Sequence, residues 1–381
     1  METVTDALVM RNFGEDLRVE RVVAKGPAPD EVLVEIAATG ICHSDLLCMS
    51  GNLPFPTPTI LGHEAAGTVA AVGTGLLGSY SVGDQVILTF DSCGDCNSCK
   101  TDHPAYCHDF TSRNAPSDLS DDGKPRLHMA TPDASPVWGK FFGQSSFARY
   151  ALVSSRSIIN ITASCGLALP REELQYLAPL GCGVQTGFGS VMNSLGVTAG
   201  SSLAVFGAGA VGLSAIMAAK AVGASIIIAI DLVESRLALA KELGATHVLL
   251  NSGTTLAQDV KDIAPVDRGV RFAIDTTGVS SVIEAMVQSL GLMGKALSVG
   301  MAYANPELKI DINQMIMSGQ SYLGCIEGDS VPDKIIPRLV EEYRNGRLPV
   351  DKMARMYPYT ECNRAIADMR SGKTVKPILV W

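Results

Sequence analysis

Apolar and polar stretches alternate most clearly between residues 203 and 231. Residues 203–206 form a short apolar run typical of a buried strand, and a glycine-rich turn and a long apolar-faced segment follow it. A second apolar run at residues 226–230 ends on Asp231. This order predicts a strand, a helix and a second strand, with the two strands parallel in one sheet.

The turn after the first strand carries Gly207, Gly209 and Gly212 in a GxGxxG pattern. The first glycine allows a tight turn, the second lets the backbone approach a pyrophosphate, and the third lets the helix pack on the strand. The helix N-terminus would then offer unpaired N–H groups to the phosphates. Asp231 follows about 20 residues later, where a carboxylate accepts the ribose hydroxyls of a dinucleotide. A structural turn without a ligand is the alternative, and it leaves Asp231 unexplained.

Asp231 also favours NAD over NADP as the dinucleotide. A carboxylate at this position would repel a 2′-phosphate, and the next two residues carry no positive charge. Arg236 is the nearest cation that could contact the cofactor, and we expect it to lie along the following helix.

The strand and helix pattern continues toward the C-terminus. Apolar runs at residues 272–275 and 296–299 each lead into a glycine-containing turn, which predicts a doubly wound parallel α/β sheet. The N-terminal region instead shows short strand-like runs at residues 7–10, 17–22 and 32–37, separated by turns with Gly and Pro. We therefore expect a mostly β region before the α/β region.

Composition narrows the class of protein. At 381 residues, 47% hydrophobic and 18% charged, the chain can form two folded domains, and disorder is not expected. A net charge of -9 argues against a nucleic-acid-binding surface, which needs clustered Lys and Arg. We see neither a secretory signal pattern nor an apolar run long enough to span a membrane. Ten cysteines in such a chain predict metal or thiol chemistry in a reducing, cytoplasmic compartment rather than disulfides.

Four of these cysteines lie close together in the chain. Cys93, Cys96, Cys99 and Cys107 belong to the segment SCGDCNSCKTDHPAYC, which is rich in turn-forming residues. Four thiolates at this spacing can surround one zinc ion and leave no position for substrate, so the predicted site is structural. An iron–sulfur cluster and two disulfides are the alternatives, and the spacing favours zinc.

Three further residues have side chains suited to a catalytic metal. Cys42 lies in GICHSD, His63 in GHE and Cys182 in PLGCG. Two thiolates and one imidazole can hold zinc and leave its fourth position open to water or substrate. The three residues are so far apart in the chain that spacing alone does not group them.

In order along the chain, GICHSD, GHE, the four-cysteine segment, PLGCG and FGAGAVG resemble the zinc-dependent medium-chain alcohol dehydrogenase family. The resemblance covers essentially the whole chain. Within the family, residues 141–152, 179–187 and 206–219 look most like the aryl- or benzyl-alcohol dehydrogenase branch.

This resemblance implies three segments and an assembly. Residues 1–183 would form a mostly β, GroES-like catalytic domain that carries the structural zinc lobe. Residues 184–325 would form a Rossmann domain that binds NAD, and residues 326–381 would return into the catalytic domain. The family also implies a homodimer through the cofactor domain, or a homotetramer.

The resemblance further implies two zinc ions per subunit, one structural and one catalytic. The catalytic ion would be held by Cys42, His63 and Cys182 and would promote loss of the alcohol proton. Ser44 would accept that proton and pass it to a ribose hydroxyl.

Two carboxylates near these ligands would support the metal. Asp45 would orient His63 through a hydrogen bond, as metal-bound histidines usually require. Glu64 would lie next to the metal and could ligate it transiently. A buried ion pair or a turn cap is the alternative for both acids.

One position departs from the family pattern. Many members carry a histidine three residues beyond the relay hydroxyl, and Leu47 stands there in this chain. His43 could then act as the base or contact the cofactor pyrophosphate. Lys376 matches a position where relatives hold the pyrophosphate with arginine, with a solvated surface lysine as the alternative. By resemblance, the loops that flank the nicotinamide contain Thr276, Val299 and Met301.

The substrate pocket would be lined by Ser44, Leu53, Thr89 and the loop 107–141. Gly51 and Leu53 stand where the glutathione-adduct branch carries acidic residues, which argues against that substrate. We therefore expect a zinc-dependent oxidoreductase that interconverts a primary aromatic or allylic alcohol and its aldehyde with NAD. An aldehyde or ketone reductase that uses NAD(P)H in a biosynthetic pathway is one alternative, and a catalytically silent NAD-binding relative is another.

Overall fold

The computed structural model describes residues 2–52, 55–116, 125–166, 168–251, 253, 255–301 and 307–381. The chain divides into two compact units. Unit 1 comprises Met1–Cys182, Val331–Glu341 and Val350–Trp381, and unit 2 comprises Gly183–Ser330 and Glu342–Pro349. Among the described residues, no helix combines the length and the apolar character needed to cross a membrane.

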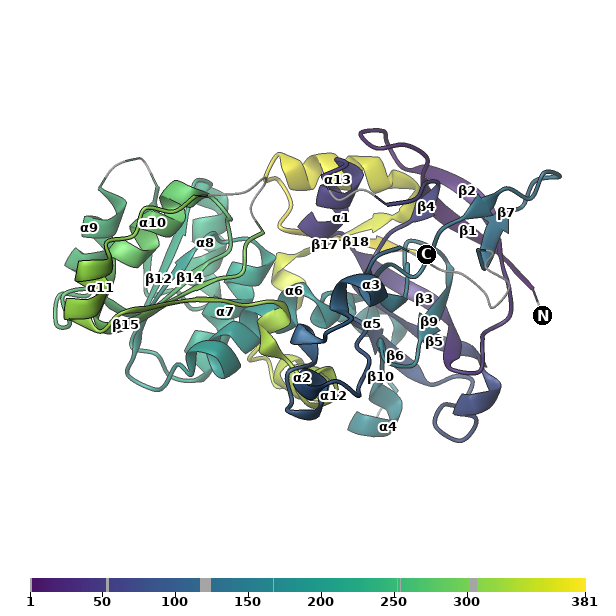
Figure 1. The fold of residues 1–381 in the computed structure, drawn as a ribbon, viewed down its shortest axis with the longest axis horizontal. Helices are drawn as coiled ribbons and strands as arrows, with labels where there is room; N and C mark the ends of the chain where they lie inside the picture. The colour runs from purple at the N-terminus through teal and green to yellow at the C-terminus, as the bar shows by residue number, and fades with distance from the viewer. Residues whose placement is uncertain are drawn as a thin grey trace. The chain divides into compact units, whose positions relative to one another are not determined.

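The described part of unit 1 contains two β-sheets (Figure 1). A five-stranded sheet has the order β4-β1-β2-β7-β8, with bounds β1 Thr3–Met10, β2 Arg18–Ala24, β4 Thr59–Ile60, β7 Leu127–Met129 and β8 Pro136–Val137. A seven-stranded sheet has the order β10-β6-β5-β3-β18-β17, and β9 also pairs with β3. Its strands are β3 Glu31–Gly40, β5 Ala65–Val72, β6 Gln85–Leu88, β9 Tyr150–Ser154, β10 Ile158–Asn160, β17 Ala354–Pro358 and β18 Lys376–Val380.

Short helices connect these strands. The α-helices of unit 1 are α1 His43–Met49, α2 Asn97–Lys100, α3 Phe110–Asn114, α4 Ile161–Cys165, α5 Arg171–Tyr176 and α13 Cys362–Arg370, and α12 Pro332–Arg344 begins in this unit. Its short turns are η1 Thr74–Leu76, η2 Pro104–Tyr106, η3 Phe141–Gly143, η4 Ala178–Gly181, η7 Val350–Met353 and η8 Tyr359–Glu361.

Strand β3 contributes residues to two apolar cores of unit 1. Its residues Val32, Val34 and Ile36 belong to one apolar core with β5, β6 and β9, while Leu33 faces a second core with β1 and β2. Because alternate residues of a strand point to opposite faces, an almost continuous apolar run is what a strand between two cores requires. The C-terminal strand β18 pairs antiparallel with β3, which places Ile378 opposite Gly40 at the end of β3.

Unit 2 contains one six-stranded parallel sheet in its described residues, with the order β13-β12-β11-β14-β15-β16. Its strands are β11 Ser202–Phe206, β12 Ile226–Asp231, β13 His247–Leu250, β14 Val270–Asp275, β15 Leu290–Ser298 and β16 Ser321–Gly324. Numbered from β11, this is the order 3-2-1-4-5-6 of dinucleotide-binding sheets. The predicted doubly wound parallel sheet is therefore confirmed.

The helices of unit 2 cover this sheet. They are α6 Gly183–Gly189, α7 Ala210–Ala221, α8 Glu234–Leu243, α9 Leu256–Ile263, α10 Ser280–Gln288 and α11 Ile312–Ser318, with the turns η5 Ser190–Leu195 and η6 Glu327–Asp329. Alternate residues of β11 and β12, such as Phe206 and Ile230, share one apolar core with Val260 of α9 and Met286 of α10. The strand period of two thus provides one continuous apolar face for α9 and α10.

Candidate metal centres and cofactor site

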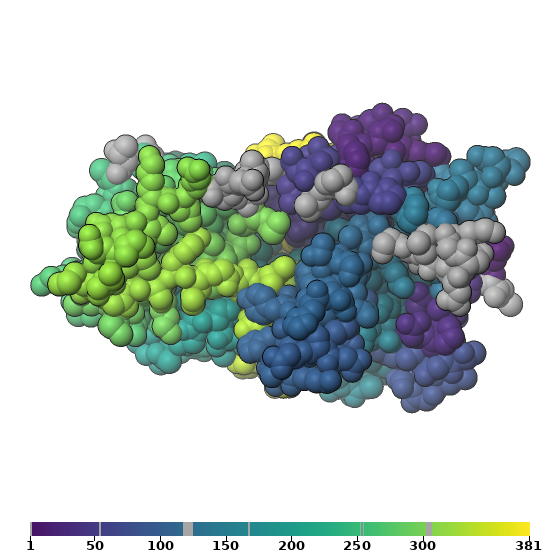
Figure 2. All heavy atoms as spheres, viewed as in Figure 1, coloured from purple at the N-terminus to yellow at the C-terminus, as the bar shows by residue number. Residues whose placement is uncertain are grey.

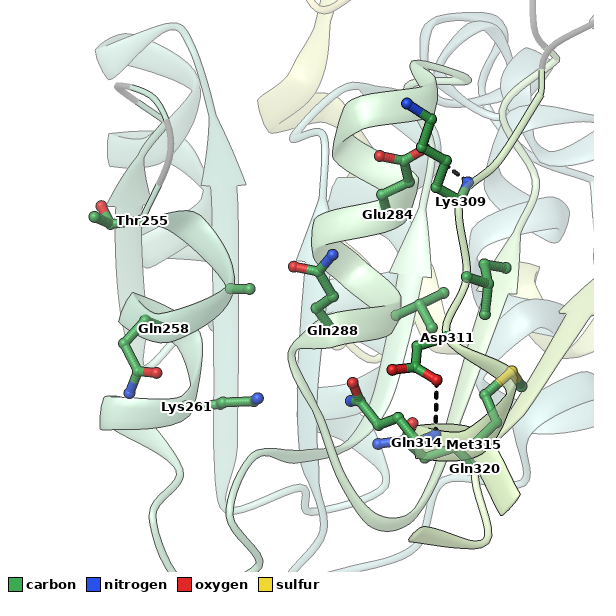
Figure 3. A pocket seen from close by; sticks show the side chains of 13 residues that line it. Thr255, Gln258, Lys261, Glu284, Gln288, Lys309, Asp311, Gln314, Met315 and Gln320 are labelled. Carbon is green, nitrogen blue, oxygen red and sulfur yellow. Dashed lines mark hydrogen bonds between the residues drawn. The ribbon is translucent and has the colours of Figure 1, made fainter. Parts of the chain in front are cut away.

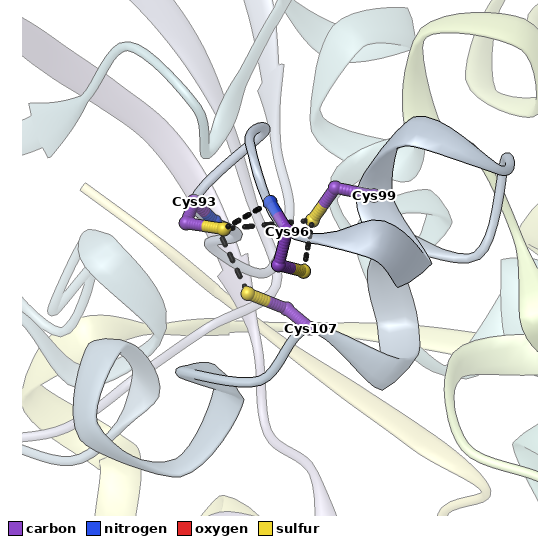
Figure 4. Close-up of side chains that lie close together, drawn as sticks. All are labelled: Cys93, Cys96, Cys99 and Cys107. Atoms are coloured by element: carbon purple, nitrogen blue, oxygen red, sulfur yellow. Dashed lines mark hydrogen bonds between the residues drawn. The ribbon is translucent and has the colours of Figure 1, made fainter.

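The four clustered cysteines converge on one point of unit 1 (Figure 4). Their sulfur atoms all lie within 4.8 Å of one another. The Sγ atoms of Cys93 and Cys99 are 3.9 Å apart, and those of Cys96 and Cys99 are 3.5 Å apart. Four sulfurs about 2.3 Å from a zinc ion would be separated by about 3.8 Å. The donor set and its spacing therefore fit one tetrahedral ion.

Backbone N–H groups support these sulfurs. The amides of Asp95 and Cys96 donate to Cys93 Sγ at 3.4 and 3.3 Å, and the amide of Cys93 donates to Cys107 Sγ at 3.2 Å. Backbone hydrogen bonds from Cys99 and His108 lower the pKa of Cys96 to about 6, whereas burial raises the pKa of Cys99 to about 12 and also raises that of Cys107. All ten cysteines are free thiols, so the two-disulfide alternative has no support in this structure.

A second cluster joins residues that are distant in the chain. Donor atoms of Cys42, His63, Glu64 and Cys182 lie within 4.8 Å of one another. Cys42 is the N-cap residue of α1, His63 and Glu64 directly precede β5, and Cys182 follows η4. The structure thus groups the predicted ligands Cys42, His63 and Cys182, which the sequence spacing did not.

Asp45 fixes the orientation of this cluster. Its Oδ1 atom lies 3.2 Å from His63 Nδ1 and accepts the Gly62 amide at 3.0 Å, while Oδ2 accepts the Cys42 amide at 2.9 Å. His63 is fully buried, and its Nε2 atom has no hydrogen-bond partner among the described residues. A buried ring nitrogen without a partner, beside two sulfurs, fits a metal ligand whose other nitrogen is held by a carboxylate.

The electrostatics of the cluster favour the thiolate form of Cys42. A hydrogen bond with Cys182, together with the nearby His63 and Lys376, holds the pKa of Cys42 well below its usual value against the effect of burial. Burial opposes a charged His63, but the Asp45 and Cys42 charges outweigh it and raise the pKa of His63. Because zinc binds thiolates, Cys42 is suited to the metal.

Lys376 is not the solvated surface residue that was the alternative to a pyrophosphate contact, because only 2% of it is exposed. Its ammonium donates to Glu64 Oε2 at 2.8 Å, to Glu64 Oε1 at 3.0 Å and to the Ile41 carbonyl at 3.1 Å. Three acceptors occupy the three protons of the ammonium, so Lys376 neutralises the buried Glu64. Burial raises the pKa of Glu64, and the charge of Lys376 opposes that rise.

The other residues predicted near the metal lie on or close to α1. Ser44 is in the first turn of α1, with its Oγ 3.8 Å from Cys42 Sγ. His43 is exposed, and Leu47 is buried on the same helix.

The residues predicted to line the substrate pocket are only partly described. Leu53 lies outside the described residues, and so do residues 117–124 of the predicted pocket loop. Thr89, also predicted to line the pocket, is fully buried, and its hydroxyl donates to the Gly181 carbonyl at 2.8 Å.

Aromatic side chains surround His63, which the sequence analysis did not predict. The ring of Phe142 stacks on His63 with centroids 4.5 Å apart, and Phe141 meets His63 edge-on at 5.3 Å. Phe110 in turn lies edge-on to Phe142 at 6.3 Å. The FFG sequence at residues 141–143 was the available signal, but nothing in its periodicity indicated a contact with a residue so far away.

The predicted glycine motif occupies the turn between β11 and α7 of unit 2. A Cβ atom on Gly207 would lie 2.3 Å from Thr276 Oγ1, and one on Gly212 would lie 1.8 Å from the Gly207 carbonyl oxygen. These two positions therefore need glycine for packing. Gly209 precedes α7 directly and has no atom within 4 Å of such a Cβ, so its backbone is accessible to a ligand at the helix N-terminus.

Asp231 ends β12 beside this turn, as predicted. Its Oδ2 accepts the Ala208 amide at 2.7 Å, and its Oδ1 accepts the Val233 amide at 2.9 Å. Arg236 lies in α8, as expected, with its guanidinium 3.9 Å from Asp231 Oδ2. Asp231 thus holds the glycine turn in place and leaves its remaining lone pairs as acceptors.

The residues predicted to flank the nicotinamide lie beyond the carboxyl ends of two neighbouring strands. Thr276 follows β14 and donates its hydroxyl to the Phe206 and Gly207 carbonyls, each at 3.1 Å. Val299 follows β15, and Met301 is 64% exposed. In open α/β sheets, ligands bind outside the carboxyl ends of the strands.

A separate hollow of unit 2, of about 650 Å³, lies between α9, α10 and the segment that leads into α11 (Figure 3). Gln258 and Lys261 come from α9, and Glu284 and Gln288 come from α10. None of the residues that line it is a predicted site residue. It is a polar surface groove and carries no chemistry of the predicted reaction.

Comparison with known proteins gives consistent matches. The family described as alcohol dehydrogenase GroES-like domain matches residues 28–163, and zinc-binding dehydrogenase matches residues 210–343. The chain is 38% identical to geraniol dehydrogenase of Castellaniella defragrans over 98% of this chain and 97% of that protein. A crystal structure of an alcohol dehydrogenase zinc-binding domain protein from Burkholderia ambifaria is 42% identical, with a TM-score of 0.93 over 100% and 99% of the two chains. Benzyl alcohol dehydrogenase from Acinetobacter calcoaceticus is 40% identical, with a TM-score of 0.91 over 99% of each chain.

Proposed function

The chain belongs to the zinc-dependent medium-chain alcohol dehydrogenase family, as its motifs indicated, and we propose that it interconverts a primary aromatic or allylic alcohol and its aldehyde with NAD as the hydride carrier. The observation that carries this proposal is the cluster of half-buried Cys42 with buried His63 and Cys182, in which His63 Nε2 has no hydrogen-bond partner among the described residues. A protein with no catalytic role would have no need of an open metal site. This argues against the silent relative.

The residues present fit a zinc ion with a free position. Cys42, His63 and Cys182 would hold it, and when bound it would supply a Lewis acid that favours the alkoxide. Asp45 keeps the proton of His63 on Nδ1 and so leaves Nε2 as the donor atom. The ion pair with Lys376 holds Glu64 next to the ligands without an uncompensated buried charge.

Ser44 is proposed to accept the proton of the substrate hydroxyl while its own hydroxyl proton would pass to a ribose hydroxyl of the cofactor. Its Oγ atom lies near Cys42 Sγ in the first turn of α1 and is only partly buried. His43 is exposed one residue earlier, where its side chain can reach water. With Leu47 at the position of the usual relay histidine, His43 is our candidate for the outer step of proton transfer.

The cofactor proposal rests on the β11–α7 turn and Asp231. The open backbone at Gly209 and the N-terminus of α7 are suited to a pyrophosphate, and Asp231 is suited to a ribose diol. The carboxylate disfavours the extra phosphate of NADP. Arg236 lies beside Asp231, where it partly offsets this charge, so we expect preference for NAD rather than exclusion of NADP.

The substrate class follows from the aromatic residues beside His63 and from the relatives. Phe142 and Phe110 are both partly exposed and give this part of unit 1 an apolar, aromatic character. Aromatic rings prefer edge-on or offset contacts with such side chains, which a planar benzylic or allylic alcohol can make. One structural relative is named for benzyl alcohol and one sequence relative for geraniol.

The assembly proposed is a homodimer through unit 2. Strand β16 is an edge of the described six-stranded sheet, and the nearby helix α11 exposes Ile312, Ile316 and Met317. The described residues 307–320, drawn in light green, lie on the face of unit 2 that Figure 2 shows. An exposed strand edge beside exposed apolar side chains is typical of an interface.

A panel of alcohols and aldehydes tests the proposed function. NADH absorbance would be followed with benzylic, allylic and short saturated alcohols, in both directions and with NAD and NADP. We expect the highest kcat/KM for the benzylic and allylic substrates with NAD. A preference for aldehyde reduction with NADPH would favour the biosynthetic reductase, and folded, zinc-loaded protein without turnover on any alcohol would favour the silent relative.

A further inference from the structure

The segment of residues 140–145 adopts an unusual backbone. Lys140, Phe142 and Ser145 all have positive φ angles, of 65°, 53° and 48°. Residues other than glycine rarely adopt this left-handed backbone conformation. Such strained residues cost about 1–3 kcal/mol each and persist where surrounding contacts determine the conformation. They cluster at functional sites, so the contacts that hold this segment are informative.

Gln144, in this segment, connects two of the chain segments that form the metal cluster. The side chain is 1% exposed, and its Nε2 atom donates to the His63 carbonyl at 3.0 Å and to the Thr89 carbonyl at 2.9 Å. Thr89 Oγ1 donates to the Gly181 carbonyl at 2.8 Å. Three hydrogen bonds therefore lead from His63, through Gln144 and Thr89, to the residue before Cys182.

The Oε1 atom of Gln144 bears on the role of this side chain. Its Oε1 atom is buried and has no hydrogen-bond partner among the described residues. A buried acceptor without a partner costs about 1–3 kcal/mol, and the two hydrogen bonds that the Nε2 atom donates to buried carbonyls offset this cost. The amide is better explained by what its two N–H groups hold in place.

We propose that Gln144 is a positioning residue for the metal cluster. Its two hydrogen bonds hold the His63 loop at a fixed distance from Thr89, which follows β6 and in turn donates to the carbonyl of Gly181, the residue before Cys182. This inference rests on the proposed function. Gln144 would contact neither metal nor substrate, and its effect would pass through the backbone of His63 and Thr89. Loss of such outer contacts typically lowers metal affinity about 10–100-fold.

The test compares two glutamines that make similar bonds. Gln144→Met removes both N–H donors but keeps the length of the side chain. Gln85→Met is the matched control, since Gln85 also ties two segments together, through the carbonyl and the amide of Leu169 at 2.7 Å each, but touches no predicted ligand. Zinc release to a chromogenic chelator would be followed from purified enzyme loaded with two zinc ions per chain.

We expect Gln144→Met to release one of its two zinc ions about tenfold faster than wild type, with the other ion unaffected, and Gln85→Met to release both at the wild-type rates. With cobalt in place of zinc, the visible spectrum of Gln144→Met should also change, whereas that of Gln85→Met should not. Equal release rates and spectra for the two variants would overturn the proposal.

A second variant covers the case in which Gln144→Met does not fold. Gln144→Asn keeps an amide but shortens its reach, and we expect it to release one zinc ion faster than wild type. Wild-type release rates in this variant would contradict the positioning role. If wild-type protein bound no zinc at the Cys42 cluster, the proposed function itself would fail, so the two failures are distinguishable.

Discussion

At the scale of single residues, Asp231 has two roles that a substitution can separate. Its carboxylate accepts the Ala208 and Val233 amides, and by proposal it also accepts the ribose hydroxyls of NAD. Asp231→Gly should therefore raise the KM for NAD about 10-fold or more. The KM for NADP should change much less, because removing the charge that repels the 2′-phosphate offsets the loss of the hydrogen bonds that Asp231 accepts.

Steady-state kinetics with both cofactors measure this ratio. Glu234→Ala removes another carboxylate from the start of α8 and serves as the control, because Glu234 is exposed. An equal rise in both KM values for Asp231→Gly would contradict the ribose assignment and leave only the structural role.

The Lys376 and Glu64 pair gives a second prediction at this scale. Both side chains are buried, so Lys376→Met leaves a carboxylate without its partner and should lower the free energy of unfolding by about 3–5 kcal/mol. Lys376→Met combined with Glu64→Gln should be less destabilised than Lys376→Met alone, because the uncompensated charge is gone. Urea unfolding of zinc-loaded protein provides the measurement.

An exposed pair provides the comparison. Lys334 and Asp102 are 2.8 Å apart with side chains 67% and 66% exposed, so Lys334→Met should cost no more than about 1 kcal/mol. A similar small cost for Lys376→Met would show that the buried pair does not contribute to stability as argued.

At the scale of elements, the segment of residues 93–107 contains only short elements of secondary structure. It consists of α2, η2 and turns, and its predicted zinc ion would supply the folding free energy that such a short segment lacks. Cys99→Ala should therefore lose one zinc ion per chain, lower the Tm and make the segment sensitive to proteases. Cys42→Ala should instead abolish turnover while the Tm falls much less.

Cys165→Ala is the control for both, since Cys165 belongs to neither cluster. Elemental analysis and thermal unfolding distinguish the outcomes. If Cys99→Ala kept two zinc ions and the wild-type Tm, the assignment of a structural site to this segment would be wrong.

The features that could be predicted from the sequence are those whose residues lie close together in the chain. The β11–α7–β12 unit and the four-cysteine segment were predictable because glycine spacing, strand period and thiol spacing are local signals. The pairing of Lys376 with Glu64 and of Gln144 with His63 was not, because the partners are 312 and 81 residues apart. These contacts depend on the β18–β3 register and on the left-handed backbone near Phe142, and neither has a periodic signature.

At the scale of the whole molecule, strand β16, one edge of the unit 2 sheet in the described residues, gives the last prediction. Ile316 and Met317 on α11 are 70% and 84% exposed, and Leu323 on the edge strand β16 is 39% exposed. Burial of such side chains against a second copy would contribute roughly 25 cal/mol per Å² of apolar surface.

We expect wild-type protein to sediment as a dimer. The double variant Ile316→Glu with Met317→Glu should sediment as a monomer, because its interface would bury charges without partners. Val266→Glu is the control, since Val266 is 92% exposed but lies outside α11 and β16. A monomeric wild-type protein, or a dimer that survives both glutamates, would show that this face is not the interface.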